Sequence, residues 1–207
     1  MNGYEIKTDV LESLYNEIST ISQKLLDSLK EKEEIICTEE FVKICFSSNI
    51  IEDTKFLNEL SGNPLFKARH ANMIIRDMIE QVIEFIYLMK NKNTIPDYMG
   101  MNTTNNALSS QNIIKEFHKL AGGRFSDGRK SVSEMAQDIG EKNSSPNHRA
   151  LYEMYQLLSE ECHNSYFFSY LDSVGDIETG KETVALTEEQ AQNLLIVIDR
   201  FMETFRN

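Results

Sequence analysis

The stretch ARHANMIIRDMIEQVIEFIYLMK, residues 68–90, decides the fold of this chain. Apolar residues recur in it at spacings of three and four, which is the pattern of an α-helix. They cover an arc too wide for a helix with one face in water, so we expect a central helix over 65–90 that is packed on most sides. The members of this arc are Ile74, Ile75, Met78, Ile79, Val82, Phe85, Ile86 and Met89.

A narrow polar strip remains on the same helix. Its members are Arg69, Arg76, Glu80, Glu84 and Tyr87, with Asp77 at the edge. One interpretation is a solvent-facing strip in which Arg76 pairs with Glu80, four residues later. The other is a strip that lines a cleft between helices, where the arginines are available to an anionic ligand.

The rest of the chain predicts an all-α helical bundle of four to five long helices plus two short ones. The long helices are expected at 8–32, 38–60, 65–90, 146–171 and 187–205, and the short ones at 111–120 and 131–140. Ser131 and Thr187 each begin a capping-box pattern, and Ser145 precedes a proline suited to the first helical position. Residues 91–109 read as a loop, and 172–186 as an irregular segment with a strand-like end over 182–186.

We expect one helical domain over residues 1–207. Within it, 1–62 is an N-terminal helical pair, 65–171 a central bundle, and 172–207 an irregular segment followed by the C-terminal helix.

Composition narrows the class of protein further. Asp and Glu number 33 against 21 Lys and Arg, for a net charge of -12, and 41% of residues are hydrophobic. This balance excludes a disordered chain, and the negative charge disfavours RNA as a partner, although one small basic site stays compatible with it. The basic, glycine-rich segment 121–130 can be read as such a small basic site for phosphate or as a connector between helices.

The compartment predicted from the sequence is the cytoplasm. No apolar run is long enough to cross a membrane, and the N-terminus has no basic region followed by an apolar stretch. The cysteines, Cys37, Cys45 and Cys162, form no CxxC pair, so we expect reduced thiols.

The predicted helix over 146–171 has an unusual polar side. Tyr152, Tyr155, Ser159, His163, Tyr166 and Tyr170 share it, whereas Met154, Leu157, Leu158, Cys162, Ser165 and Phe168 make an expected core stripe. The polar side is either a hydrated helix–helix interface or a ligand wall. In the second case His163 lies at its middle and can act as an acid or a base near neutral pH.

A metal centre has weaker support in the sequence. Glu160 and His163 form one Glu-x-x-His pair, but di-iron bundles need two such pairs and two further carboxylates. None of the other histidines has Glu three residues before it, so we expect no cofactor. A metal-dependent bundle enzyme using Glu80, Glu160 and His163 stays an alternative, while the common nucleotide and hydrolase motifs are absent.

Two segments carry a resemblance to a known family. They are ARHANMIIRDMIEQVIEFIYL at 68–88 and LYEMYQLLSEECHNSYFFSYL at 151–171, the second with a histidine in a Tyr- and Ser-rich context. Residues 67–171 resemble an uncharacterised bacterial family of helical proteins that is distantly similar to HEPN domains. HEPN domains are helical bundles, often dimers, found in toxin–antitoxin and phage-defence systems, and many are metal-independent RNases.

The HEPN motif consists of an Arg, a polar residue and a His a few residues on. His163-Asn164 matches its His end, but Leu157 and Leu158 stand where the resemblance requires the Arg. Arg76 of the neighbouring predicted helix would have to take its place.

These patterns together predict a bacterial binding or regulatory module in a defence or stress setting, acting as a homodimer. Its ligand is a small anion or a protein partner. In the expected site, His163, Arg76 and Glu80 are the candidate catalytic residues; the candidate ligand-binding residues are Arg69, Asp77, Tyr152, Ser159, Asn164 and Tyr166. The chief alternative is a metal-independent RNase with His163 as acid or base and Arg76 stabilising the charge on the phosphate. Whether the chain is an enzyme stays open.

Overall fold

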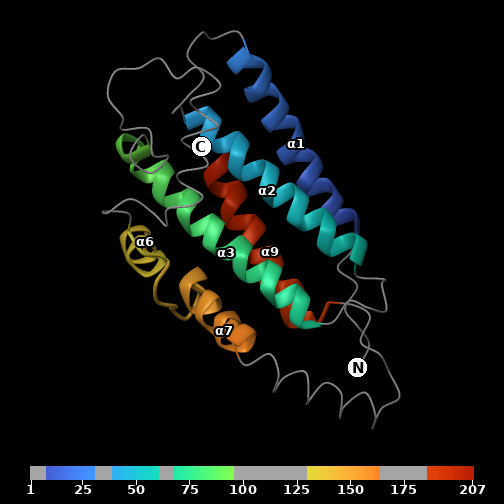
Figure 1. Cartoon of the computed structure of the whole chain (residues 1–207), viewed down its shortest axis with the longest axis vertical. Coiled ribbons are helices and arrows are strands. Elements are labelled where there is room, and N and C mark those ends of the chain that lie inside the picture. Colours follow the sequence, from blue (N-terminus) through green and yellow to red (C-terminus); the bar gives the residue numbers. More distant parts are fainter. Residues whose placement is uncertain (1–7, 31–38, 61–67, 96–129, 164–185) are drawn as a thin grey trace.

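The computed structural model describes residues 8–30, 39–60, 68–95, 130–163 and 186–207. Within these ranges the chain is helical and contains no strand, as predicted (Figure 1). The helices are α1 (Thr8–Lys30), α2 (Glu39–Leu60), α3 (Ala68–Lys90), the 3-10 turn η1 (Lys92–Thr94), α6 (Val132–Ile139), α7 (Leu151–His163) and α9 (Glu188–Phe205). The predicted helix at 111–120 and residues 182–185 of the strand-like segment at 182–186 lie outside the described residues, and Leu186 is described without a strand.

Helix α3 is the centre of the bundle. It packs against α2, α6, α7 and α9, whereas α1 packs on α2 (Figure 1). The prediction of a helix covered on most sides is therefore confirmed. One residue of the predicted polar strip, Tyr87, is buried instead, because α6 packs on α3. The Lys130 ammonium lies 5.4 Å from the Tyr87 ring centroid.

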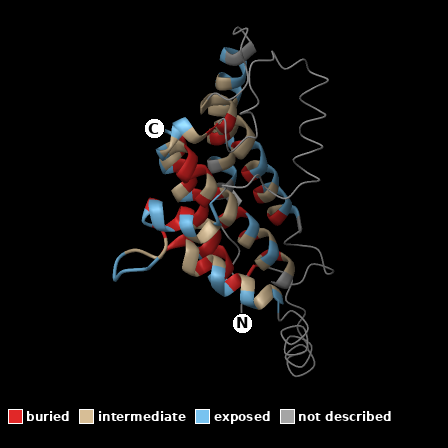
Figure 2. Cartoon of the chain, turned by 60° about the vertical axis from the view of Figure 1, so that its left-hand side comes forward, coloured by how far each residue is buried: buried red, intermediate tan, exposed pale blue. Residues whose placement is uncertain are grey.

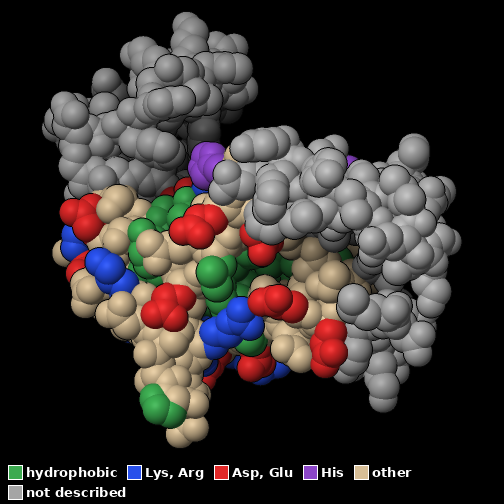
Figure 3. All heavy atoms as spheres, turned by 90° about the horizontal axis from the view of Figure 1, so that it is seen from below, with side chains coloured by type: hydrophobic (Ala, Val, Ile, Leu, Met, Phe, Trp, Pro, Cys, Tyr) green, Lys and Arg blue, Asp and Glu red, His purple; other side chains and the backbone are tan. Residues whose placement is uncertain are grey.

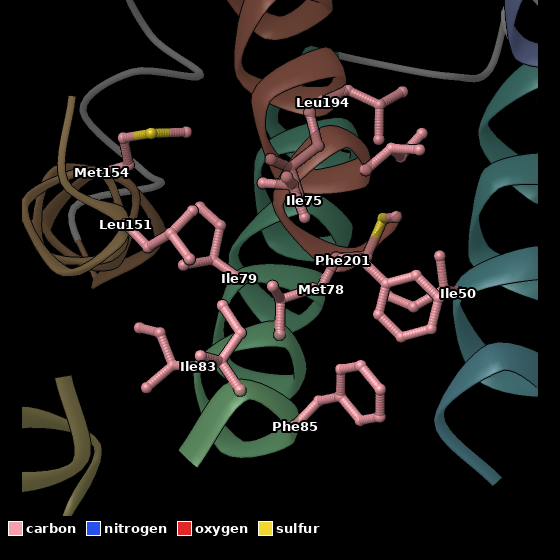
Figure 4. Close-up of a cluster of buried hydrophobic side chains, with 14 of the residues drawn as sticks. Ile50, Ile75, Met78, Ile79, Ile83, Phe85, Leu151, Met154, Leu194 and Phe201 are labelled. Carbon is pink, nitrogen blue, oxygen red and sulfur yellow. The ribbon is translucent and has the colours of Figure 1, made fainter. Parts of the chain in front are cut away.

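Aromatic rings fill the core between α3 and α9. Phe85 is fully buried, and its ring centroid lies 4.8 Å from that of Phe201 and 5.5 Å from that of Phe46 on α2. Aliphatic side chains continue this core toward α7, where Leu151 and Met154 lie on the opposite side of α3 from Ile50 (Figure 4). Buried residues accordingly follow the inner faces of the helices, and exposed ones their outer faces (Figure 2).

The capping boxes at α6 and α9 are confirmed. Ser131 Oγ accepts from the Glu134 amide at 3.3 Å, and Thr187 Oγ1 accepts from the Gln190 amide at 3.2 Å. Helix α6 ends at Gly140, whose φ of 83° is the left-handed conformation that glycine adopts without strain.

The predicted start of α7 at Pro146 is wrong. Ser145 and His148 instead exchange backbone hydrogen bonds of 2.8 and 3.0 Å across a tight turn, and α7 begins at Leu151. The Glu141 carboxylate accepts from the Leu151 amide at 3.1 Å, so a tertiary contact supplies the negative charge that a helix N-terminus favours.

One member of the predicted core stripe of α7 is misplaced. Leu157 is 53% exposed, while Leu151, Met154 and Leu158 are buried. Consecutive helical residues point about 100° apart, so Leu157 and Leu158 cannot both face the same neighbour directly. No helix in the described ranges is long and apolar enough to cross a membrane.

Candidate functional site

Arg76 of α3 reaches across to α7. Its Nε donates to Ser159 Oγ at 3.0 Å, and its Nη2 donates to the Tyr155 hydroxyl at 2.7 Å. The same Nη2 lies 3.4 Å from Glu80 Oε2, one turn along α3. We call Arg76, Glu80, Tyr155 and Ser159 the α3–α7 seam.

The seam orients the guanidinium rigidly. Ser159 accepts from Arg76 and donates its own proton to the Tyr155 carbonyl oxygen at 2.7 Å, which commits the hydroxyl to the helix backbone. The guanidinium carbon also lies 4.7 Å from the Tyr155 ring centroid, close enough for a cation–π contact. Two directional hydrogen bonds and a stacked ring hold Arg76 in one orientation.

Tyr152 extends this arrangement by a second ring. Its centroid lies 5.9 Å from that of Tyr155 with an interplanar angle of 18°, so the two rings are stacked. Burial raises the pKa of the Tyr155 hydroxyl, and the negative charge of Glu80 raises it further, while the Arg76 charge acts in the opposite direction. Tyr155 therefore stays protonated at neutral pH and serves the seam as a neutral hydroxyl.

The seam is open to solvent in part. The Arg76 and Glu80 side chains are 30% and 31% exposed. Arg76 uses Nε and Nη2 for the contacts above, and its Nη1 has no partner among the residues that the structure describes. An oriented guanidinium with donor atoms left over can bind a carboxylate or phosphate oxygen.

A second polar network crosses the same helices on the other flank of α7. Asn72 Nδ2 donates to Glu161 Oε2, and Asn72 Oδ1 accepts from Gln190 Nε2 at 2.7 Å. Burial raises the pKa of Glu161, and the charge of Glu189 adds to the effect. This network joins α3, α7 and the beginning of α9.

The structure brings some of the predicted site residues together. Arg76, Glu80 and Ser159 meet in the seam, and Tyr152 joins it through its stacking on Tyr155. Asp77 is exposed on α3 and accepts from Gln81 at 2.8 Å, so it belongs to a contact within α3 and not to the seam.

His163 lies at the last residue of α7, exposed, and four residues beyond Ser159. One helical turn is about 5.4 Å along the axis, so His163 lies about one turn along α7 from Ser159. Asn164, Tyr166 and the side chain of Arg69 lie outside the described part of the chain.

The metal alternative has no support in the described ranges. They contain no group of three or more His, Cys, Asp or Glu side chains placed to hold an ion. Glu80, Glu160 and His163 thus do not converge on a common point.

The sequence analysis missed a charged cluster between the 140–150 loop and α9. The Glu141 carboxylate lies 3.1 Å from His148 Nε2 and 3.4 Å from Arg200 Nε, at angles that make these contacts electrostatic and not hydrogen bonds. Arg200 Nη2 lies 2.6 Å from His148 Nδ1. Arginine only donates, so Nδ1 of His148 accepts in this contact.

This cluster could not be found from spacing. His148 and Arg200 are 52 residues apart, and neither is part of a motif. No family model, curated protein or solved structure matches the chain, so the resemblance to HEPN domains stays a prediction.

Proposed function

We propose that this protein is a helical binding or regulatory module that takes a small anionic ligand at the α3–α7 seam. The observation that carries the proposal is Arg76, which Tyr155 and Ser159 orient while its Nη1 has no partner among the described residues. The bacterial defence or stress setting and the homodimer that the resemblance implies are part of the same proposal.

The contacts of the seam favour binding over catalysis. The Ser159 proton is committed to a backbone oxygen, and burial keeps the Tyr155 hydroxyl protonated. Neither hydroxyl is therefore poised as a nucleophile. The arrangement instead offers a fixed positive charge beside stacked aromatic rings.

The overall charge favours a small ligand. With a net charge of -12, the chain repels a long phosphate backbone, whereas a single anion meets only its immediate surroundings. Acidic side chains are spread over the described surface seen in Figure 3, with hydrophobic atoms between them.

The test is a titration with inorganic phosphate, followed through the backbone amide signals of α3 and α7 in NMR spectra, which every variant retains. We expect Arg76→Gln to weaken phosphate binding at least about tenfold, the effect of one charge-assisted contact. Arg206→Gln is the matched control, because it removes the same charge from an exposed pair with Glu17. Equal binding by Arg76→Gln and the unmodified protein contradicts the proposal.

A second function, a metal-independent RNase, is favoured by one observation. His163 is exposed one helical turn beyond Ser159, the residue that Arg76 contacts. In this case His163 moves the proton and Arg76 stabilises the charge that develops on the phosphate. RNA cleaved in EDTA by the unmodified protein, and left intact by a folded His163→Ala variant, is the expected result; intact RNA in both samples removes this candidate.

A further inference from the structure

Carboxylates form a ridge along α3 beside Arg76, in which Asp77 is exposed and Glu80 and Glu84 are half-buried. Asp77, Glu80 and Glu84 follow one another at spacings of three and four, so they lie along one side of the helix. Asp77 accepts a hydrogen bond from Gln81. Of these three carboxylates, Glu80 is the one that forms an ion pair with Arg76. Glu80 is thus the acidic group that any anion arriving at Arg76 meets first.

The contact of Arg76 with Glu80 is longer than its contacts with Tyr155 and Ser159. Tyr155 and Ser159 accept from the guanidinium at 2.7 and 3.0 Å, whereas the Glu80 oxygen lies at 3.4 Å. A strong charge-assisted hydrogen bond is shorter than this, and both partners are partly in water, where ion pairs contribute little. Glu80 is therefore the most weakly bound of these three partners of Arg76.

We infer that Glu80 is a specificity-determining residue: it holds Nη2 of Arg76 when no ligand is bound, and an anion that binds Nη1 and Nη2 together must displace it. This inference rests on the proposed function of the seam. When Glu80 is displaced, Tyr155 and Ser159 keep the guanidinium oriented. Ligand binding therefore does not have to include the entropy cost of ordering the Arg76 side chain. The resting Glu80 contact lowers the affinity for an anion that binds both Nη atoms by the free energy of that ion pair.

The same ridge determines the class of ligand. Residues 77–84 extend about 10 Å along the helix axis, within roughly one Debye length at physiological ionic strength. A compact anion, such as a single phosphate or carboxylate, places its charge at Arg76 alone. A chain of phosphates would place further charges beside Glu80 and Asp77, so the ridge selects compact anions over polyanions.

The experiment compares inorganic phosphate with tripolyphosphate on the full chain. Glu80→Gln removes the charge and keeps the size of the side chain. We expect it to tighten phosphate binding about three- to fivefold, the upper part of the range of a surface ion pair converted into affinity, and tripolyphosphate binding by more. Glu203→Gln is the matched control, because Glu203 pairs with Arg200 at 3.3 Å within α9, outside the seam; it should leave phosphate affinity within about twofold of the unmodified value.

The outcomes separate this inference from the proposed function. If Glu80→Gln and the unmodified protein bind phosphate equally while Arg76→Gln does not bind it, Glu80 is no competitor and the anion site itself stands. If Arg76→Gln binds as the unmodified protein does, the anion site is refuted. Glu80→Ala, checked for folding by circular dichroism, must reproduce the gain seen with Glu80→Gln; a gain confined to one of them overturns the inference.

Discussion

Replacing Glu141 should destabilise the protein more than its loop position suggests. Its side chain is only 10% exposed, and its carboxylate accepts from the Leu151 amide and faces both His148 and Arg200. Removing one partner of a buried ion pair costs about 3–5 kcal/mol, because the remaining charge is left without compensation. The loss of an acceptor for a buried amide adds about 1 kcal/mol.

Partial exposure of the partners reduces this cost. The side chains of His148 and Arg200 are 28% and 29% exposed, so water can solvate them once the carboxylate is gone. We therefore expect Glu141→Ala to lower the free energy of unfolding by about 2–4 kcal/mol. Glu141→Gln should cost about 1–2 kcal/mol, since an amide oxygen can still accept from Leu151 but carries no charge.

Urea unfolding at neutral pH, followed by far-UV circular dichroism, measures both values. Adding Arg200→Met completes a double-mutant cycle, in which Glu141→Gln and Arg200→Met should couple by at least about 1 kcal/mol. A loss below about 1 kcal/mol for Glu141→Ala, or additive effects in the cycle, would show that the cluster does not hold α9 to the loop.

Three further predictions concern stability. Phe85→Ala removes the central ring of the core and should cost about 3–5 kcal/mol in urea unfolding; a cost under about 2 kcal/mol would contradict the packing described for α3 and α9. Thr187→Ala should cost about 1 kcal/mol through the lost cap of α9, whereas Thr187→Ser should retain most of it. Glu161 has a raised pKa, so its charge opposes folding at pH above that value, and the penalty vanishes below the ordinary carboxyl pKa, where both states are protonated. Glu161→Gln should therefore stabilise the protein at neutral pH by a few tenths of a kcal/mol, reduced by partial exposure, and equal stability at all pH values would refute this cause.

Much of the fold follows from local patterns. The apolar arc of 68–90 required a central helix, and the caps at Ser131 and Thr187 located two helix starts because a side-chain oxygen satisfies amides only a few residues away. The start of α7 was not predicted because it depends on a contact between residues that are not neighbours in the sequence. There the amide of Leu151 is satisfied by Glu141, ten residues earlier, and local spacing does not contain that contact.

Part of the candidate site was predictable as well. The Arg76–Glu80 pair follows from a spacing of four on one helix, and Ser159 was expected to share a face with Tyr155. Tyr155 was nevertheless not among the predicted site residues, although it makes the shortest contact with Arg76. Periodicity shows which residues share a face, but it does not show how far each reaches toward the next helix.

The amino-acid sequence alone determined that the described chain is helical, where its capped helices begin and which helix lies at the centre, because these depend on periodicity and on contacts within a turn. Only the tertiary structure decided which polar groups meet. Arg76 and Tyr155 are 79 residues apart, and Glu141 faces Arg200 from another element. Such meetings depend on how each helix is rotated against its neighbour, and that rotation follows from the packing of the whole core.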